Sequence, residues 1–203
     1  MMRALLLLTC AACSARATAP DQRIRNQPIE TAAMPAEPVQ TAVPGPSIYD
    51  LPVSLVAADG THIGLDVARG KLVLVSMFYA SCTVACPLLV SEVNQVLAEL
   101  PADVRDDVAV LLVSFDPARD TPAKLGEVAR ERKLDAQWTL AVASDSDARA
   151  LAAVLGVKYR KLANGDFAHG STIVLLDREG REISRADALG QRDSLVRAAI
   201  AYH

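Results

Sequence analysis

The 203-residue chain has little of what marks several common classes of protein. Aromatic residues make up only 4% of it, and its lysines and arginines form no cluster in a chain of net charge −3. A nucleic-acid-binding surface needs a basic patch, so we expect no nucleic-acid partner. The sequence also lacks an apolar run near the roughly 20 residues that a membrane-spanning helix needs. Cysteine and histidine are scarce, with four and three residues.

The first 17 residues have the parts of a secretory signal peptide. Arg3 precedes the short apolar run Ala4–Leu8, and small residues follow that run. We therefore expect export, to a bacterial periplasm. Cys13 follows two alanines and resembles the lipidation site of a bacterial lipoprotein, which would anchor the chain to a membrane. Lipidation at Cys10 and ordinary cleavage after Ala17 are the alternatives that the sequence leaves open.

Residues 18–47 contain six prolines among Ala, Thr and Gln, a composition typical of an extended linker. Residues 48–203 are enough for one domain of ordinary size. Cys82 and Cys86 are the only cysteines of this domain. A disulfide between them would close too short a loop to restrict the unfolded chain much. A chemical role is therefore favoured over a purely stabilising bridge.

Hydrophobic patterns in residues 48–203 predict an α/β domain with a central mixed sheet, flanked by helices, and an N-terminal β-hairpin. The hairpin is expected within residues 52–67. The other expected strands are 71–79, 108–115, 138–143, 171–176 and 181–184, and the expected helices are 87–100, one from Thr121, 145–155 and 193–202. Because proline disfavours the helical conformation of the residue before it, we expect the first helix to begin at Pro87.

Cys82 and Cys86 lie where the strand 71–79 gives way to the helix 87–100. Ligands bind at this end of the strands in open α/β sheets, and a helix N-terminus favours a thiolate. Two thiolates suit Cu(I) or Zn(II), but a closed zinc site needs four protein ligands. With two cysteines and three histidines available, copper fits the domain better.

A histidine is the expected third ligand. His169 precedes the strand 171–176, so its loop can reach the ligand-binding edge of the sheet; His62, in the hairpin, is the alternative, and His203 is the last residue. A second function stays open, that of a thiol–disulfide oxidoreductase in which Cys82 attacks and Cys86 resolves. That function would make the protein an enzyme, whereas copper delivery would not.

Three features together resemble the Sco/SenC family of copper chaperones. They are the segment Phe78–Pro87, the segment Val113–Pro122, and His169 eight residues before Asp177. The resemblance spans about residues 47–184. It implies a thioredoxin-like fold and a role in assembling the dinuclear copper centre of cytochrome c oxidase. The copper-bearing subunit of the oxidase, or another copper acceptor, would then be the partner.

The resemblance also implies that Cys82, Cys86 and His169 bind copper. The sequence departs from the family pattern after the first cysteine, where Thr83-Val84 replaces the Pro-Asp of many members. A second departure is Gly170, because the family's histidine is often followed by serine. Both departures leave the three expected ligands in place and bear on affinity, redox potential and choice of acceptor.

Two aspartates lie in the second of these segments. Asp116 has two possible roles: tuning the thiolates or docking a partner, or starting a turn. Asp120 is expected only to help form the turn into the next helix. Met77, Phe78 and Tyr79 are expected in the core and the wall of the site, not as ligands.

Overall fold

The computed structural model describes residues 45–82 and 85–203. The expected signal peptide, Cys13 and most of the expected linker lie outside these residues. Within them, no helix combines the length and the apolar character needed to cross a membrane. The first element of the described residues is a short 3₁₀ helix, η2 (Ile48–Asp50).

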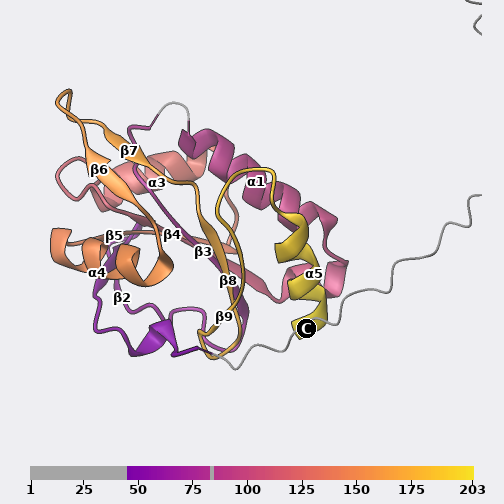
Figure 1. The fold of residues 1–203 in the computed structure, drawn as a ribbon. Coiled ribbons are helices and arrows are strands. Elements are labelled where there is room, and N and C mark those ends of the chain that lie inside the picture. Colours follow the sequence, from indigo (N-terminus) through magenta and orange to yellow (C-terminus); the bar gives the residue numbers. More distant parts are fainter. Residues whose placement is uncertain (1–44, 83–84) are drawn as a thin grey trace, which may run out of the picture. The chain divides into compact units, whose positions relative to one another are not determined.

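A seven-stranded mixed sheet forms the centre of the domain (Figure 1), in the order β2-β1-β5-β4-β3-β8-β9. Its middle is parallel: β3 (Leu72–Phe78), β4 (Val108–Ser114) and β5 (Trp138–Ala143). All seven residues of β3 are buried, as expected of a strand covered on both faces. The antiparallel strands at the two edges are β1 (Leu55–Ala57), β2 (His62–Ile63), β8 (Ile173–Leu176) and β9 (Glu182–Ala186).

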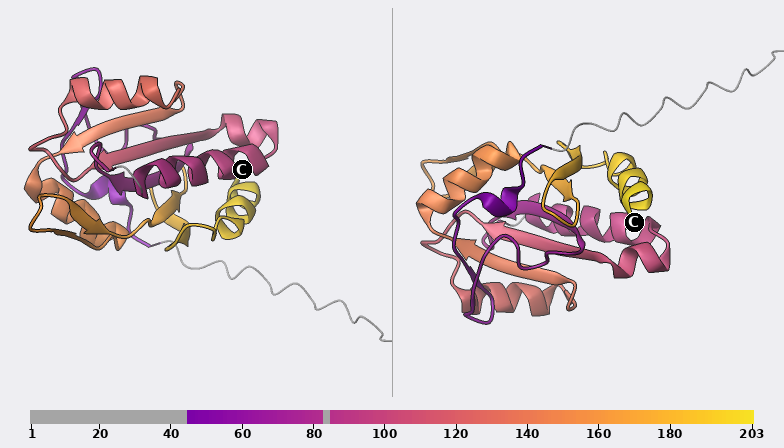
Figure 2. Two further views of the ribbon diagram at one scale, coloured as in Figure 1. Left: turned by 90° about the horizontal axis from the view of Figure 1, so that it is seen from above. Right: turned by 90° about the horizontal axis from the view of Figure 1, so that it is seen from below.

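Helices cover both faces of this sheet. They are α1 (Ala85–Glu99), the short α2 (Ala102–Asp106), α3 (Pro122–Glu131), α4 (Asp145–Leu155) and α5 (Asp193–Tyr202). In Figure 1, α1 and α5 lie to the right of the strands and α4 lies to the left. Helix α1 packs against α5, which covers β8 and β9, whereas α3 packs on β5 and β1 at the other end of the sheet (Figure 2). The expected α/β architecture is confirmed.

The expectation that the first helix begins at Pro87 is wrong, because α1 begins at Ala85. Proline is tolerated in the first turn of a helix, where the backbone N–H groups have no intrahelical partner. Cys86 therefore belongs to the helix. The hairpin is also shorter than expected. Strand β2 has two residues, and β1 pairs with β5 as well as with β2, so the hairpin extends the main sheet.

A second hairpin was not expected from the sequence. Strands β6 (Tyr159–Lys161) and β7 (Phe167–His169) form a two-stranded sheet of their own. The Asn164-Gly165 turn signal lies between them, with Gly165 at φ +87°. His169, expected in a loop, is the last residue of β7. The hairpin therefore places His169, and it does so from outside the main sheet.

Candidate metal centre

Cys82 and Cys86 lie at the carboxyl end of β3 and the N-terminus of α1. The Sγ of Cys82 accepts a hydrogen bond from the backbone N–H of Cys86 at 3.3 Å. A helix N-terminus that donates an N–H to sulfur favours the thiolate. The Sγ of Cys86 instead donates to the carbonyl oxygen of Tyr79 at 3.2 Å. The two side chains are 8% and 5% exposed.

The two sulfurs thus have different surroundings. Burial raises the pKa of the Cys86 thiol well above its ordinary value, and the negative charges of Cys82 and Asp120 raise it further. The hydrogen bond to Tyr79 opposes this shift only in part. Cys86 therefore keeps its proton at neutral pH in the metal-free protein. A cation bound beside it would displace that proton, because metal binding requires the thiolate.

The imidazole of His169 presents one ring nitrogen to the cysteines. Its Nδ1 lies 2.8 Å from the carbonyl oxygen of Gly170. Because a carbonyl oxygen can only accept, Nδ1 carries a proton, and Nε2 is the ring nitrogen left to bind a metal ion. Nε2 lies 4.0 Å from the Sγ of Cys82. The backbone thus fixes the tautomer and aims a nitrogen ligand at the sulfurs, an arrangement typical of metal-binding histidines.

One ligand atom from each of Cys82, Cys86 and His169 lies within 4.8 Å of the other two. Three such atoms around one ion, with sulfur at about 2.3 Å and nitrogen at about 2.0 Å, would be about 3.8 Å apart. The observed set therefore needs only a small contraction to bind a metal ion. In the part of the chain that the structure describes, no other group of three Cys, His, Asp or Glu side chains is this close. The alternative His62 lies in β2, at the far edge of the sheet.

Aromatic rings surround the imidazole. We call Tyr79, Phe115, Tyr159 and Phe167 the aromatic cluster; they are four of the chain's eight aromatic residues. The His169 ring lies edge-on to Tyr79 and Phe115, with centroids 5.6 and 5.4 Å apart. Phe167 contacts the same two rings at 5.3 and 5.1 Å. Tyr79 thus forms part of the wall of the site, as expected, and the rings join the hairpin to the ends of β3 and β4.

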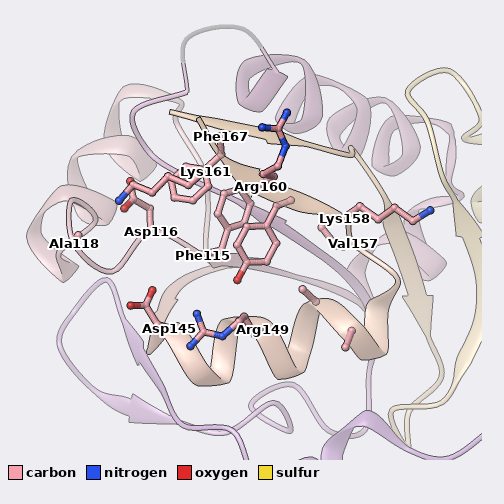
Figure 3. A pocket seen from close by; sticks show the side chains of 13 residues that line it. Phe115, Asp116, Ala118, Asp145, Arg149, Val157, Lys158, Arg160, Lys161 and Phe167 are labelled. Atoms are coloured by element: carbon pink, nitrogen blue, oxygen red, sulfur yellow. The ribbon is translucent and has the colours of Figure 1, made fainter. Parts of the chain in front are cut away.

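A groove of about 700 Å³ separates the hairpin from α4. Figure 3 shows Phe115 and Phe167 facing it from one side and Asp145 and Arg149 of α4 facing it from the other. Three rings of the aromatic cluster, Phe115, Tyr159 and Phe167, therefore line the groove, and Phe115 also contacts His169. The hairpin is packed on the side of the cysteines and open on the side of α4.

Asp120 takes part in the turn before α3, as expected, but its side chain also has a second role. It is 1% exposed, and its Oδ2 accepts hydrogen bonds from the N–H of Ala80 at 2.7 Å and from the hydroxyl of Ser114 at 2.5 Å. It therefore ties the segment before Cys82 to β4. Burial raises the pKa of its carboxyl group. The residue pattern does not indicate this second role, because aspartate beside Thr-Pro is typical of a turn.

Asp116 belongs to the same turn. Its backbone carbonyl accepts hydrogen bonds from the N–H groups of Arg119 and Asp120, and its buried carboxylate pairs with the Arg119 guanidinium. Arg119, which the sequence analysis did not single out, also reaches the hairpin, where its Nη1 lies 3.3 Å from Asp166 Oδ1.

Comparison with known families identifies this arrangement. The model of the SCO1/SenC family matches residues 42–202. The chain belongs to the SCO1/SenC family. This Sco/SenC chain is 27% identical over 124 residues to a protein of Stutzerimonas stutzeri named "Putative copper-binding protein". The match covers 61% of this chain and 56% of that protein, so the aligned part spans little more than half the length of the relative.

Solved structures share the fold. Copper-bound ScoI of Bradyrhizobium japonicum is 23% identical, with a TM-score of 0.62 over 80% of this chain and 100% of that one. BsSco, described as a member of the Sco family of cytochrome c oxidase assembly proteins, is 19% identical, with a TM-score of 0.62 over 73% and 90%. The fold is therefore thioredoxin-like, as the sequence resemblance implied.

The unlike surroundings of the two sulfurs predict unlike reactivity. In the reduced, metal-free protein at pH 7, iodoacetamide should label Cys82 faster than Cys86, because the thiolate is the nucleophile and the raised pKa keeps Cys86 protonated. Raising the pH should speed the labelling of Cys86 more than that of Cys82. Mass spectrometry of time points measures both rates, and the unfolded protein, with equal rates expected, is the control. Faster labelling of Cys86 at pH 7 would contradict this description.

Proposed function

We propose that this Sco/SenC protein is a copper metallochaperone that binds copper through Cys82, Cys86 and His169. The observation that carries the proposal is the convergence of two sulfurs and one imidazole nitrogen within 4.8 Å. The orientation of His169 supports it as well, because Nδ1 is bound to Gly170 and Nε2 faces the sulfurs. Membership of the SCO1/SenC family agrees with both observations.

The set of ligands favours copper over zinc. Two thiolates and one imidazole suit the soft Cu(I) ion, whereas a structural zinc site has four protein ligands. Among the described residues, the group contains no fourth Cys, His, Asp or Glu side chain. Asp120, the buried carboxylate nearby, already accepts two hydrogen bonds through Oδ2. The negative charge of Asp120 favours a cation at the cysteines, although Asp120 is not one of the ligands.

We propose that copper is passed to the copper-bearing subunit of cytochrome c oxidase, or to another acceptor, by stepwise exchange of ligands. Cys82 and Cys86 are held by the main sheet and α1. His169 belongs to a hairpin outside that sheet and is only partly buried. The imidazole is therefore the ligand that an incoming thiolate of the acceptor can replace first. Transfer then needs no cleavage of a substrate bond and no change in oxidation state.

A thiol–disulfide oxidoreductase is the second candidate, favoured by the different states of the two sulfurs. The Cys82 thiolate would attack a partner disulfide and release one partner thiolate. The Cys86 thiol would lose its proton and attack Cys82 in the mixed disulfide, releasing the second partner thiolate. The partner disulfide gains two electrons, and Cys82 and Cys86 become a disulfide. This reaction needs both cysteines and has no need of His169.

For the location, we propose export to the bacterial periplasm and attachment to a membrane through a lipid on Cys13. The support is the sequence of the first 17 residues and the proline-rich segment 18–47, whose composition is typical of a spacer. A tether of this kind would keep the metal centre near membrane-bound acceptors.

Replacing His169 separates the two candidate functions. In cells at limiting copper, His169→Ala should lower the assembly of the oxidase copper centre by about tenfold or more, because the imidazole completes the ligand set. Its exchange with a small disulfide should stay close to wild type. Cys82→Ser should abolish both, and His62→Ala is the matched control that should change neither. Normal oxidase assembly by His169→Ala, with failure by Cys82→Ser, would favour the reductase over the chaperone.

The proposed anchor is tested in the cell envelope. Globomycin, which blocks lipoprotein signal cleavage, should make an unprocessed precursor accumulate, and Cys13→Ser should move the protein from the membrane to the soluble fraction. Cys10→Ser is the control for the alternative lipidation site and should leave the distribution unchanged. If neither globomycin nor Cys13→Ser has an effect, the protein has no lipid on Cys13.

A further inference from the structure

We infer that Arg119 is a positioning residue that holds hairpin β6–β7 so that His169 faces the two cysteines. Its neighbour Asp120 holds the cysteine segment in the same way. Two consecutive residues of one turn thus support the two halves of the metal centre. The inference rests on the proposed function, because it assumes that the site binds copper. The contacts that support it are those of the metal-free protein.

The hairpin needs an anchor. It forms a separate two-stranded sheet, in which neither strand pairs with a strand of the main sheet. An isolated two-stranded hairpin is at best marginally stable in water, so its position depends on contacts with the rest of the domain. On the side of α4 it faces the groove of about 700 Å³ (Figure 3) and has little to pack against. The aromatic cluster and Arg119 supply the contacts between the hairpin and the ends of β3 and β4.

Arg119 makes these contacts with both ends of its guanidinium group. Its Nε pairs with the carboxylate of Asp116, whose side chain is 3% exposed, and its Nη1 lies 3.3 Å from Asp166 Oδ1 in the hairpin. The guanidinium carbon lies 5.4 Å from the ring centroid of Tyr79 and 5.9 Å from that of Phe167. A planar, fork-shaped cation can pair with two carboxylates and pack over rings at once, whereas lysine offers a single point charge.

Arg119 contacts the hairpin close to the metal-ligand residue His169. Asp166 directly precedes β7, and His169 is the last residue of that three-residue strand. Alternate residues of a strand share a face, so Phe167, which lies beneath the Arg119 guanidinium, is on the same face as His169. Fixing Asp166 and Phe167 therefore fixes the direction of the imidazole.

Asp120 of the same turn holds the segment that carries the cysteines. Its carboxylate accepts a hydrogen bond from the backbone N–H of Ala80, which lies in the segment between β3 and Cys82. The same carboxylate is held by the hydroxyl of Ser114 at the end of β4. The turn thus links the cysteine segment and the histidine hairpin, and the distance between them is set by one short stretch of chain.

Arg119→Gln tests this role in the metal-free protein. Without the cation, amides of the hairpin in residues 159–170 should exchange with deuterium about tenfold faster, because local opening costs less free energy. Amides of β3 and β4 should keep their wild-type rates. Arg119→Lys, which keeps the charge but not the fork, should give an intermediate rate. Arg160→Gln is the matched control, an exposed arginine of the same hairpin, and should exchange like wild type.

A second readout follows the imidazole itself. In the protein loaded with Cu(II), pulsed EPR should detect imidazole nitrogen coupling in the wild type and in Arg160→Gln, and a severalfold weaker signal in Arg119→Gln. Cu(I) affinity, which depends mainly on the two sulfurs, should change by less than about threefold.

Two results would overturn the inference. One is that the hairpin amides of Arg119→Gln exchange with deuterium at the wild-type rate. The other is an equal increase of exchange in β3 and β4, because Arg119 would then stabilise the whole fold and not the hairpin. If the wild type binds no copper, the proposed function fails, whereas the exchange rates of the metal-free variants still decide the role of Arg119.

Discussion

The contact between hairpin β6–β7 and the ends of β3 and β4 is the constraint on which the metal centre depends. The cysteines belong to the main sheet and α1, but the histidine belongs to a small sheet of its own. The rings of the aromatic cluster and the guanidinium of Arg119 bring these two parts together. Aromatic pairs contribute about 0.5–1.5 kcal/mol each beyond the burial of their area. Such contacts can define a position and still allow the histidine to move when copper is handed over.

The electrostatics of the metal centre also favour the binding of a cation. Asp120 is buried under the cysteine segment, and burial raises the pKa values of its carboxyl group and of the Cys86 thiol. Burial makes the charged forms of both groups less favourable, and a cation bound near them offsets that cost. The metal-free site is therefore a place where negative charge is costly and a soft cation is favoured. The fixed tautomer of His169 adds a neutral ligand without adding charge.

The strong features of the fold could be predicted because they follow from long, regular patterns. The apolar runs that became β3, β4 and β5 predicted strands of a central mixed sheet, and the position of Cys82 and Cys86 at a strand–helix junction predicted the site. Short elements gave no such signal. Three-residue strands such as β6 and β7 are too short for a period, so the hairpin that holds His169 was missed.

The supporting residues were missed for a different reason. Asp116, Arg119 and Asp120 form one turn, and their residue types are those of any exposed turn. Only the folded chain shows that Asp120 points under the cysteine segment and that Arg119 reaches Asp166. From residue spacing alone His169 was preferred to His62 but not decided, because both lay near the expected sheet; the structure brings only His169 to the sulfurs.

X-ray absorption at the copper edge of the Cu(I)-loaded, reduced protein tests the central claim most directly. We expect two sulfur scatterers and one nitrogen scatterer, with the outer-shell pattern of an imidazole that disappears in His169→Ala. A copper ion bound only by sulfur in the wild type would contradict the account. An imidazole pattern that persists in His169→Ala would contradict it as well, because another histidine would then be the ligand.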